Sequence, residues 1–128
     1  MTYIKSYKEL IVWQKSIDLV IEIYKLTDKF PKSELYGIIS QMRRAAISIP
    51  SAIAEGYGRK SSKEYLQYYS IAYGSALELE TQIIISKKLQ FISETNFYKA
   101  ELLLEEVCKM LNSMIYKIKK LNIKKTKR

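Results

Sequence analysis

The sequence has 128 residues, 48% of them hydrophobic, with four glycines, two prolines and a formal net charge of +9, which suits one globular helical domain. It contains no histidine and a single cysteine, Cys108, so neither a zinc site of the usual ligands nor a nucleophile paired with histidine can be assembled. No apolar run exceeds four residues, far short of the ~20 that a membrane-spanning helix needs, and no secretory signal is expected. These features predict a cytoplasmic protein that is not an enzyme and holds no cofactor or metal.

The positive charge is concentrated at the C-terminal end. Residues 117–128 contain seven lysines and arginines and no acid, whereas the other 116 residues carry fifteen basic and thirteen acidic groups. The expected division is a four-helix bundle, residues 1–121, and a basic C-terminal tail, residues 122–128. Such a tail attracts polyanions by screened Coulomb forces and counterion release. The alternative is a solvated tail that only improves solubility.

The first helix is expected to begin at Ser6, because Ser6 and Glu9 have the spacing of a capping box. Two apolar stripes follow side by side. Two stripes are more than one intramolecular seam requires and favour a second contact with a partner subunit. One stripe contains Leu10, Trp13, Ile17, Val20 and Tyr24, and the other contains Val12, Leu19, Ile23, Leu26 and Phe30.

Phe30-Pro31 ends this pattern, and a second helix is predicted from Leu35 onward. Its apolar stripe consists of Leu35, Ile39, Met42, Ala46, Ile49 and Ile53. Pro50 lies inside the stripe and removes the hydrogen bond to the Ala46 carbonyl, so one kinked helix is expected. Gly56 or Gly58 is expected to end it in a left-handed conformation.

The third helix is predicted to open with a second capping box, Ser61 to Glu64. Its core stripe consists of Tyr65, Tyr69, Ala72, Ala76, Leu79 and Ile83, with Leu66, Tyr73, Leu77 and Ile84 in a neighbouring stripe. Gly74 lies in the middle of the helix, where glycine costs about 1 kcal/mol relative to alanine. A close contact with another backbone is therefore expected there.

The last helix is predicted to open at Ser93, with Cys108 as a small core residue. Its core face is assigned to Leu103, Val107, Met110, Met114, Ile118 and Leu121, with Leu104, Cys108, Leu111 and Ile115 alongside. Four helices joined by short turns predict an all-α fold, an up-down-up-down antiparallel four-helix bundle with a proline-kinked second helix.

Two acidic residues of the third helix, Glu78 and Glu80, are two positions apart and so point to different sides. This spacing argues against a paired acid and base. One of them is expected to form an ion pair with Arg43 or Arg44 of the second helix.

Several short motifs resemble one known family over about residues 7 to 120. They are Asp18-Leu19, Phe30-Pro31-Lys32-Ser33-Glu34, Gln41-Met42-Arg43-Arg44-Ala45, Ser48-Ile49-Pro50-Ser51, Ile53-Ala54-Glu55-Gly56, Gly58-Arg59 and the segment Ala72 to Thr81. The chain resembles the four-helix-bundle proteins encoded in intervening sequences of bacterial 23S rRNA genes, which are related to the accessory variability determinant of diversity-generating retroelements. The family usually has asparagine where this chain has Ala52. The resemblance implies a homopentamer with a basic surface and a link to structured RNA or DNA.

Two functions are compatible with these observations. The first is binding of nucleic acid, RNA above all, through backbone phosphates, since five copies of a +9 chain would carry about +45. Tyr57 and Tyr65 could stack on unpaired bases, although core packing is the commoner role of such tyrosines. The second is a structural adaptor that recruits a protein partner, such as a reverse transcriptase. The candidate nucleic-acid-binding residues are Arg43, Arg44, Arg59, Lys60 and Lys63 in one patch and Lys119, Lys120, Lys124 and Lys125 near the C-terminus.

Overall fold

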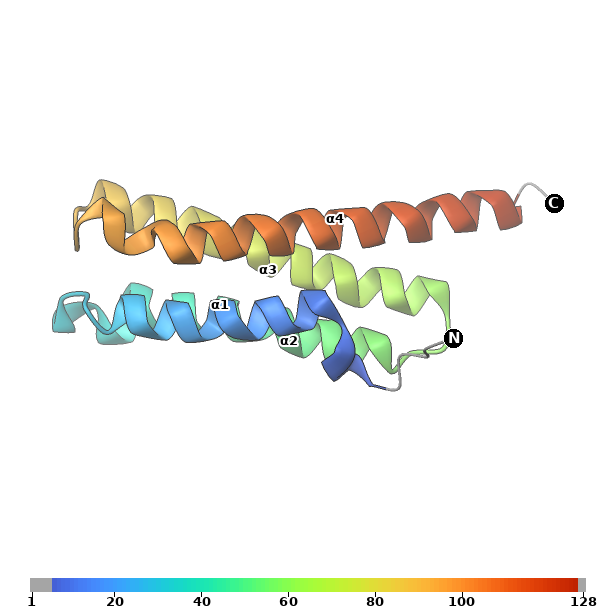
Figure 1. The fold of residues 1–128 in the computed structure, drawn as a ribbon, viewed down its shortest axis with the longest axis horizontal. Helices are drawn as coiled ribbons and strands as arrows, with labels where there is room; N and C mark the ends of the chain where they lie inside the picture. The colour runs from blue at the N-terminus through green and yellow to red at the C-terminus, as the bar shows by residue number, and fades with distance from the viewer. Residues whose placement is uncertain (1–5, 127–128) are drawn as a thin grey trace.

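The computed structural model describes the backbone of residues 6–126 and the side chains of residues 6–121. Within this range four long α-helices pack antiparallel, up-down-up-down, without a β-strand, which confirms the predicted fold class (Figure 1). Short helical turns accompany the long helices. In chain order the elements are η1 (Tyr7–Glu9), α1 (Ile11–Thr27), η2 (Lys32–Glu34), η3 (Leu35–Ile39), α2 (Ser40–Tyr57), α3 (Ser62–Lys88), η4 (Glu94–Phe97) and α4 (Tyr98–Thr126).

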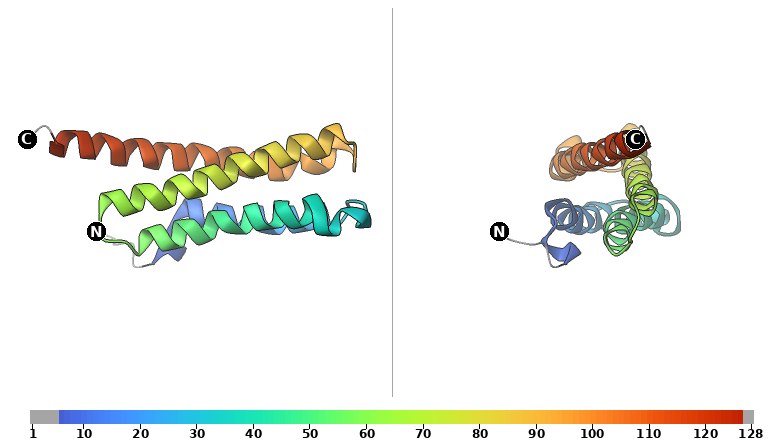
Figure 2. Two further views of the ribbon diagram at one scale, coloured as in Figure 1. Left: turned by 180° about the vertical axis from the view of Figure 1, so that it is seen from behind. Right: turned by 90° about the vertical axis from the view of Figure 1, so that its right-hand side faces the viewer.

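The helices form an elongated bundle in which each helix packs on its neighbours in sequence and α1 also packs on α4. The α2–α3 pair makes the most extensive contact. The connections α1–α2 and α3–α4 lie at one end of the bundle, while the α2–α3 turn and the C-terminal end of α4 lie at the other (Figures 1 and 2). With 29 residues in the described chain, α4 is about 43 Å long and is the longest of the four helices.

The core follows the predicted stripes of the first three helices. In α1 the stripe from Val12 to Phe30 is buried, whereas in the stripe from Leu10 to Tyr24 the first four residues are half-buried and Tyr24 is exposed. In α2 and α3 the predicted core positions are buried, except that Leu35 is exposed and Tyr65 half-buried. The buried apolar side chains of the described helices therefore meet in one central core.

The expected start of the first helix is wrong in detail. Ser6 Oγ accepts a hydrogen bond from the Lys8 amide at 3.1 Å and caps only the single 3₁₀ turn η1. Leu10 is extended, with φ −70° and ψ 126°, so α1 begins at Ile11. The Ser61 capping box is confirmed at the serine, because Ser61 Oγ accepts from the Glu64 amide at 3.2 Å.

The second helix is interrupted before its proline and continues through it. Gly37 has non-helical angles, φ −109° and ψ −116°, inside the π-helical segment η3, so Leu35 and Ile39 do not continue α2 as one regular helix. Pro50 is buried inside α2, which runs on to Tyr57. Pro50 has no N–H group to donate to the Ala46 carbonyl. At the neighbouring position, Ser51 Oγ donates to the Ile47 carbonyl at 2.9 Å.

The glycines do not act as the sequence predicts. Gly58 ends α2 with φ −78°, and no described glycine has a positive φ, so the expected left-handed termination is wrong. Gly56 instead permits close packing, because a Cβ there would lie 2.9 Å from Tyr68 Cβ. A Cβ at Gly74 would meet nothing within 4 Å, so the expected contact is absent from the described chain.

The start and the core face of the last helix also differ from expectation. Ser93 precedes the 3₁₀ turn η4, and α4 begins at Tyr98. The buried face of α4 includes Leu104, Val107, Leu111 and Ile115, whereas the residues expected there, apart from Val107, are half-buried or, for Leu121, exposed. The backbone remains helical to Thr126, into the segment 122–128 that was expected to form a tail.

None of the helices in residues 6–126 has the combination of length and apolar character that crossing a membrane requires.

Candidate nucleic-acid interface

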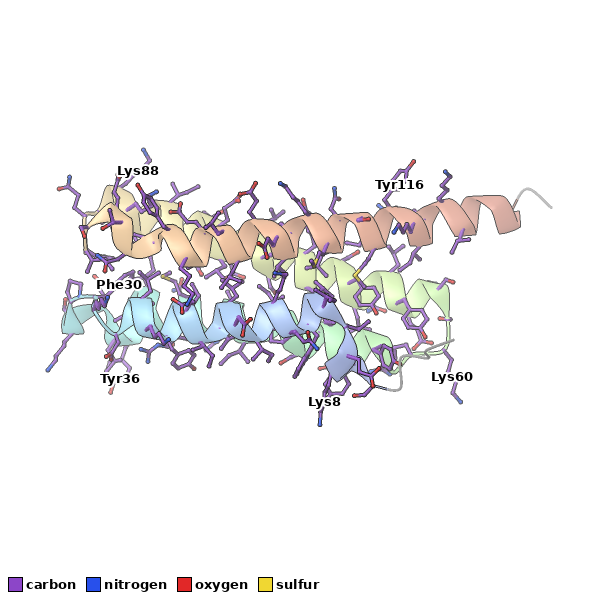
Figure 3. The ribbon with its side chains drawn as sticks, in the orientation of Figure 1. Lys8, Phe30, Tyr36, Lys60, Lys88 and Tyr116 are labelled. Atoms are coloured by element: carbon purple, nitrogen blue, oxygen red, sulfur yellow. The ribbon has the colours of Figure 1, made fainter. Side chains whose placement is uncertain are left out.

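Cationic side chains from two distant segments lie at the end of the bundle that carries the α2–α3 turn. Arg59 and Lys60 lie in or next to this turn and Lys63 in the first turn of α3, while three further lysines follow Tyr116 on α4. Figure 3 labels Lys60 and Tyr116 at this end of the bundle. We call this surface the cationic end. Its members are Arg59, Lys60, Lys63, Lys117, Lys119 and Lys120, and all six are exposed.

The cations of this surface have no carboxylate partner among side chains 6–121. The acidic residues that flank the turn are Glu55 and Glu64, and the Glu64 carboxylate accepts a hydrogen bond from Ser61 Oγ at 3.2 Å. Unpaired exposed lysines keep their full charge available to an external anion. The antiparallel arrangement thus places two segments that are separate in sequence at the same end of the bundle.

One arginine of the cationic end is fixed by a tyrosine that sequence reasoning missed. The Arg59 guanidinium lies 4.6 Å from the ring centroid of Tyr68 and donates to the Tyr68 hydroxyl at 2.8 Å. Nothing in the sequence marks this tyrosine among its neighbours Tyr65 and Tyr69, because the pairing depends on how the turn directs Arg59. The contact limits the motion of a side chain that can still donate to phosphate.

The two candidate stacking tyrosines are more enclosed than a free stacking platform. Tyr57 and Tyr65 are half-buried, and the Tyr65 ring lies parallel to Tyr69 with centroids 6.2 Å apart. Burial, with smaller effects from Tyr65 and Tyr57, raises the pKa of Tyr69 above its usual value. The Tyr65 ring is therefore already stacked on a ring of the same protein, Tyr69.

Arg43 and Arg44 do not lie with Arg59. They precede it by about 16 residues along α2, which is roughly 24 Å of helix. Arg43 turns toward α1, where its Nε donates to Thr27 Oγ1 at 3.0 Å, and Arg44 is exposed. The candidates Lys124 and Lys125 lie outside the described side chains.

Within the described chain, neither Arg43 nor Arg44 forms the expected ion pair with Glu78 or Glu80. Ion pairs among side chains 6–121 centre on α4 and involve lysines: Lys15–Glu106, Lys25–Glu22, Lys87–Glu101, Lys99–Glu22 and Lys109–Glu105. Glu78 instead accepts from Gln82 Nε2 at 3.4 Å, and Glu80 lines the α3–α4 groove. The bundle register is thus supported by lysine pairs with α4.

Metal ligands and the one cysteine were the remaining candidates for reactive groups among the described residues. No group of three histidine, cysteine or acidic side chains among them is arranged to hold a metal ion. Cys108 is half-buried, and burial, together with the Glu80 carboxylate, raises the pKa of its thiol. A raised pKa lowers the thiolate fraction and with it the reactivity of the thiol.

The chain is similar to known proteins in both sequence and fold. Residues 8–113 match the family described as 23S rRNA-intervening sequence protein. A crystal structure of a protein of unknown function from the S23 ribosomal protein family of Bacteroides thetaiotaomicron is similar, with 21% sequence identity and a TM-score of 0.76. The match covers 83% of this chain and 96% of that one. The comparison with curated proteins gives no significant match.

Proposed function

The chain belongs to the 23S rRNA-intervening sequence protein family, and from this premise we propose that it is a non-enzymatic homo-oligomer that binds structured nucleic acid, RNA above all. The observation that carries the proposal is the cationic end, where Arg59, Lys60 and Lys63 join the lysines of α4 without a carboxylate partner among the described side chains. Such a surface contacts backbone phosphates and does not read bases.

Salt dependence gives the direct test. Each lysine or arginine that neutralises a phosphate releases counterions, so log K should fall linearly with log salt concentration. We expect this behaviour for a structured RNA hairpin. The triple variant K60Q/K63Q/K119Q should reduce the slope by about 2 to 3, since each phosphate contact contributes about 1.

A matched triple variant separates local contacts from net charge. K25Q/K99Q/K109Q removes the same charge from lysines that are paired with carboxylates. It should leave the slope nearly unchanged. Equal slopes for wild type and both variants would reject the cationic end as the interface, and an affinity that ignores salt would reject phosphate binding altogether.

The oligomer is supported by the stripe of α1 that the core does not bury. Trp13, Ile17 and Val20 line a shallow groove of about 300 Å³ with Ile47 and Pro50 of α2, and the exposed Ile21 and Tyr24 lie on the outward side of α1. Burying these side chains against sister copies would gain about 25 cal/mol per Å² of apolar surface. The family resemblance suggests five subunits.

Light scattering tests the assembly. We expect a mass several times the 15.0 kDa of one chain, and Val20→Asp should dissociate the particle because it places a charge in the groove. Leu102→Asp, at an exposed apolar position on α4, is the control and should leave the mass unchanged. A wild-type mass near 15.0 kDa would refute the oligomer.

The same groove supports a second candidate function. If the protein is a monomer, the apolar stripe of α1 remains open for another protein, and the adaptor role becomes the better proposal. A protein partner such as a reverse transcriptase would then lose binding to Val20→Asp and keep binding to K60Q/K63Q/K119Q.

A further inference from the structure

A small pocket lies at the end of the bundle opposite the cationic end, between the end of α1, η2 and the start of α2. Its volume is about 240 Å³. Its polar lining consists of Thr27, Asp28, Lys32 and Arg43, and Phe30 is among its apolar lining residues. Figure 3 labels Phe30 at this end and Lys60 at the other.

Arg43 is held in this pocket by two contacts with α1. Its Nε donates to Thr27 Oγ1 at 3.0 Å, and its guanidinium lies 4.5 Å from the ring centroid of Tyr24. Thr27 is only 1% exposed, and its hydroxyl is itself oriented by donation to the Ile23 carbonyl at 2.7 Å. The arginine is therefore positioned before any ligand arrives, which reduces the entropy lost on binding.

The remaining donors of Arg43 are unused. No hydrogen bond or ion pair engages its terminal nitrogens within residues 6–121, although Asp28 also lines the pocket. Lys32 brings a second cation to the same pocket and has no carboxylate partner in this part of the chain. Two cations against the single carboxylate of Asp28 around one half-enclosed space favour an anionic ligand.

We propose that this pocket binds a single phosphate group through Arg43 and Lys32, with Thr27 as the positioning residue. A volume of about 240 Å³ is below the roughly 300 to 1,000 Å³ of pockets that enclose whole small molecules, so the rest of the ligand stays outside. A phosphate offers oxygens to both the planar fork of Arg43 and the ammonium of Lys32, whereas a carboxylate has only two oxygens. The apolar part of the wall consists of Phe30, Leu35 and Ile39.

The test uses the Nε–H group of Arg43 as its reporter. Full-length ¹⁵N-labelled protein is titrated with inorganic phosphate at constant ionic strength, with chloride as the exchanged anion. We expect a saturable shift of the Arg43 Nε–H and Thr27 amide signals. A second titration with a single-stranded oligoribonucleotide distinguishes the source of the phosphate: saturation at lower concentration than inorganic phosphate indicates a strand, and no gain indicates a small phosphoester.

Three variants distinguish the contribution of the Arg43–Thr27 geometry to phosphate binding from that of net charge. Arg43→Lys keeps the charge but loses the fork and the bond to Thr27, and should abolish the saturable shift of the Thr27 amide. Thr27→Val keeps the shape and removes the acceptor that orients Arg43, and should weaken phosphate binding about tenfold. Arg44→Gln removes a charge one residue away, outside the pocket lining, and should change the affinity by less than about twofold.

The opposite results would overturn the site. Equal, non-saturating shifts in wild type and all variants would show a general ionic effect, and equal weakening by Arg44→Gln and Arg43→Lys would show that only net charge matters.

If Thr27→Val fails to fold, Thr27→Ser, which keeps the hydroxyl, should retain wild-type affinity. If Arg43→Lys changes only the oligomer mass and wild type ignores phosphate, Arg43 binds a sister copy instead. The K60Q/K63Q/K119Q variant should keep the Arg43 response to inorganic phosphate, so this proposal and the cationic end fail independently.

Discussion

Gln90 holds a backbone conformation that favours glycine. Its φ is +58°, the one positive value outside glycine in the described chain, and it ends α3 in a Schellman motif. Its amide donates to the Lys87 carbonyl at 3.1 Å, and the Phe91 amide donates to the Ser86 carbonyl at 3.4 Å. A residue with a Cβ loses about 1 kcal/mol or more in this conformation.

Gln90→Gly should therefore stabilise the bundle by about 1 kcal/mol, which corresponds to a rise of about 4 °C in the midpoint of thermal unfolding for a chain of this size. Circular dichroism melts measure it. Gln67→Gly, at an exposed position inside α3, is the control and should lower stability by about the same amount. A fall in the midpoint for both variants would contradict the argument.

Gly56 and Gly74 make a second residue-level comparison. A methyl group at Gly56 would lie 2.9 Å from Tyr68 Cβ, a distance that forces α2 and α3 apart, whereas Gly74 faces open space. Gly56→Ala should destabilise the protein by about 1 to 3 kcal/mol, and Gly74→Ala should stabilise it by up to about 1 kcal/mol. Chemical denaturation gives both values. Should Gly74→Ala lower stability and also reduce the oligomer mass, a sister copy packs on this face of α3.

The packing around Gly56 and the backbone conformation of Gln90 could not be predicted from the sequence. Composition identifies glycine as unusual in a helix, but which glycine meets a neighbour depends on the α2–α3 crossing, which no local pattern encodes. A positive φ at Gln90 is likewise imposed by the turn that follows α3. Sequence patterns alone would assign that conformation to a glycine.

At the scale of elements, periodicity predicts helices better than it predicts which stripe is buried. The predicted α3 stripe is confirmed from Tyr69 to Ile83, whereas Leu77 and Ile84 of the neighbouring apolar stripe are exposed. In α4 two apolar stripes adjoin, and the buried one, from Leu104 to Ile115, is selected by the position of α1 and α3. The same ambiguity in α1 was resolved by the core, which left the Trp13 stripe half-exposed.

The irregular segment η3 is expected to be the part of the described chain most susceptible to proteolysis. Tyr36 is 94% exposed and precedes Gly37, whose angles break the helix. Chymotrypsin should therefore cut after Tyr36 or Leu35 before other sites, because cleavage requires locally unfolded chain. Mass spectrometry of early digests identifies the cut. Tyr98 and Tyr116 are exposed within regular α4 and are internal controls, and earlier cleavage at either would refute the prediction.

At the scale of the molecule, antiparallel topology makes half of the candidate site predictable. Four alternating helices must bring residues near the α2–α3 turn to the same end as the last turns of α4, so Lys60 and Lys119 lie at one end of the bundle. The Arg43 pocket could not be foreseen in the same way. It depends on the Thr27 hydroxyl, a buried group whose hydrogen bond to Arg43 crosses between helices.

The spacing of Arg43 and the cationic end along α2 sets a footprint for any nucleic acid that spans both. Arg43 precedes Arg59 by about 16 residues, which is roughly 24 Å of helix and is covered by about 7 base pairs of a duplex. In a series of DNA duplexes of increasing length, affinity should rise abruptly near this value, because only longer duplexes bridge the cationic end and Arg43 at once. Arg43→Lys should remove the step while leaving the short duplexes unaffected, and a smooth rise in wild type would mean that the two ends act on separate strands.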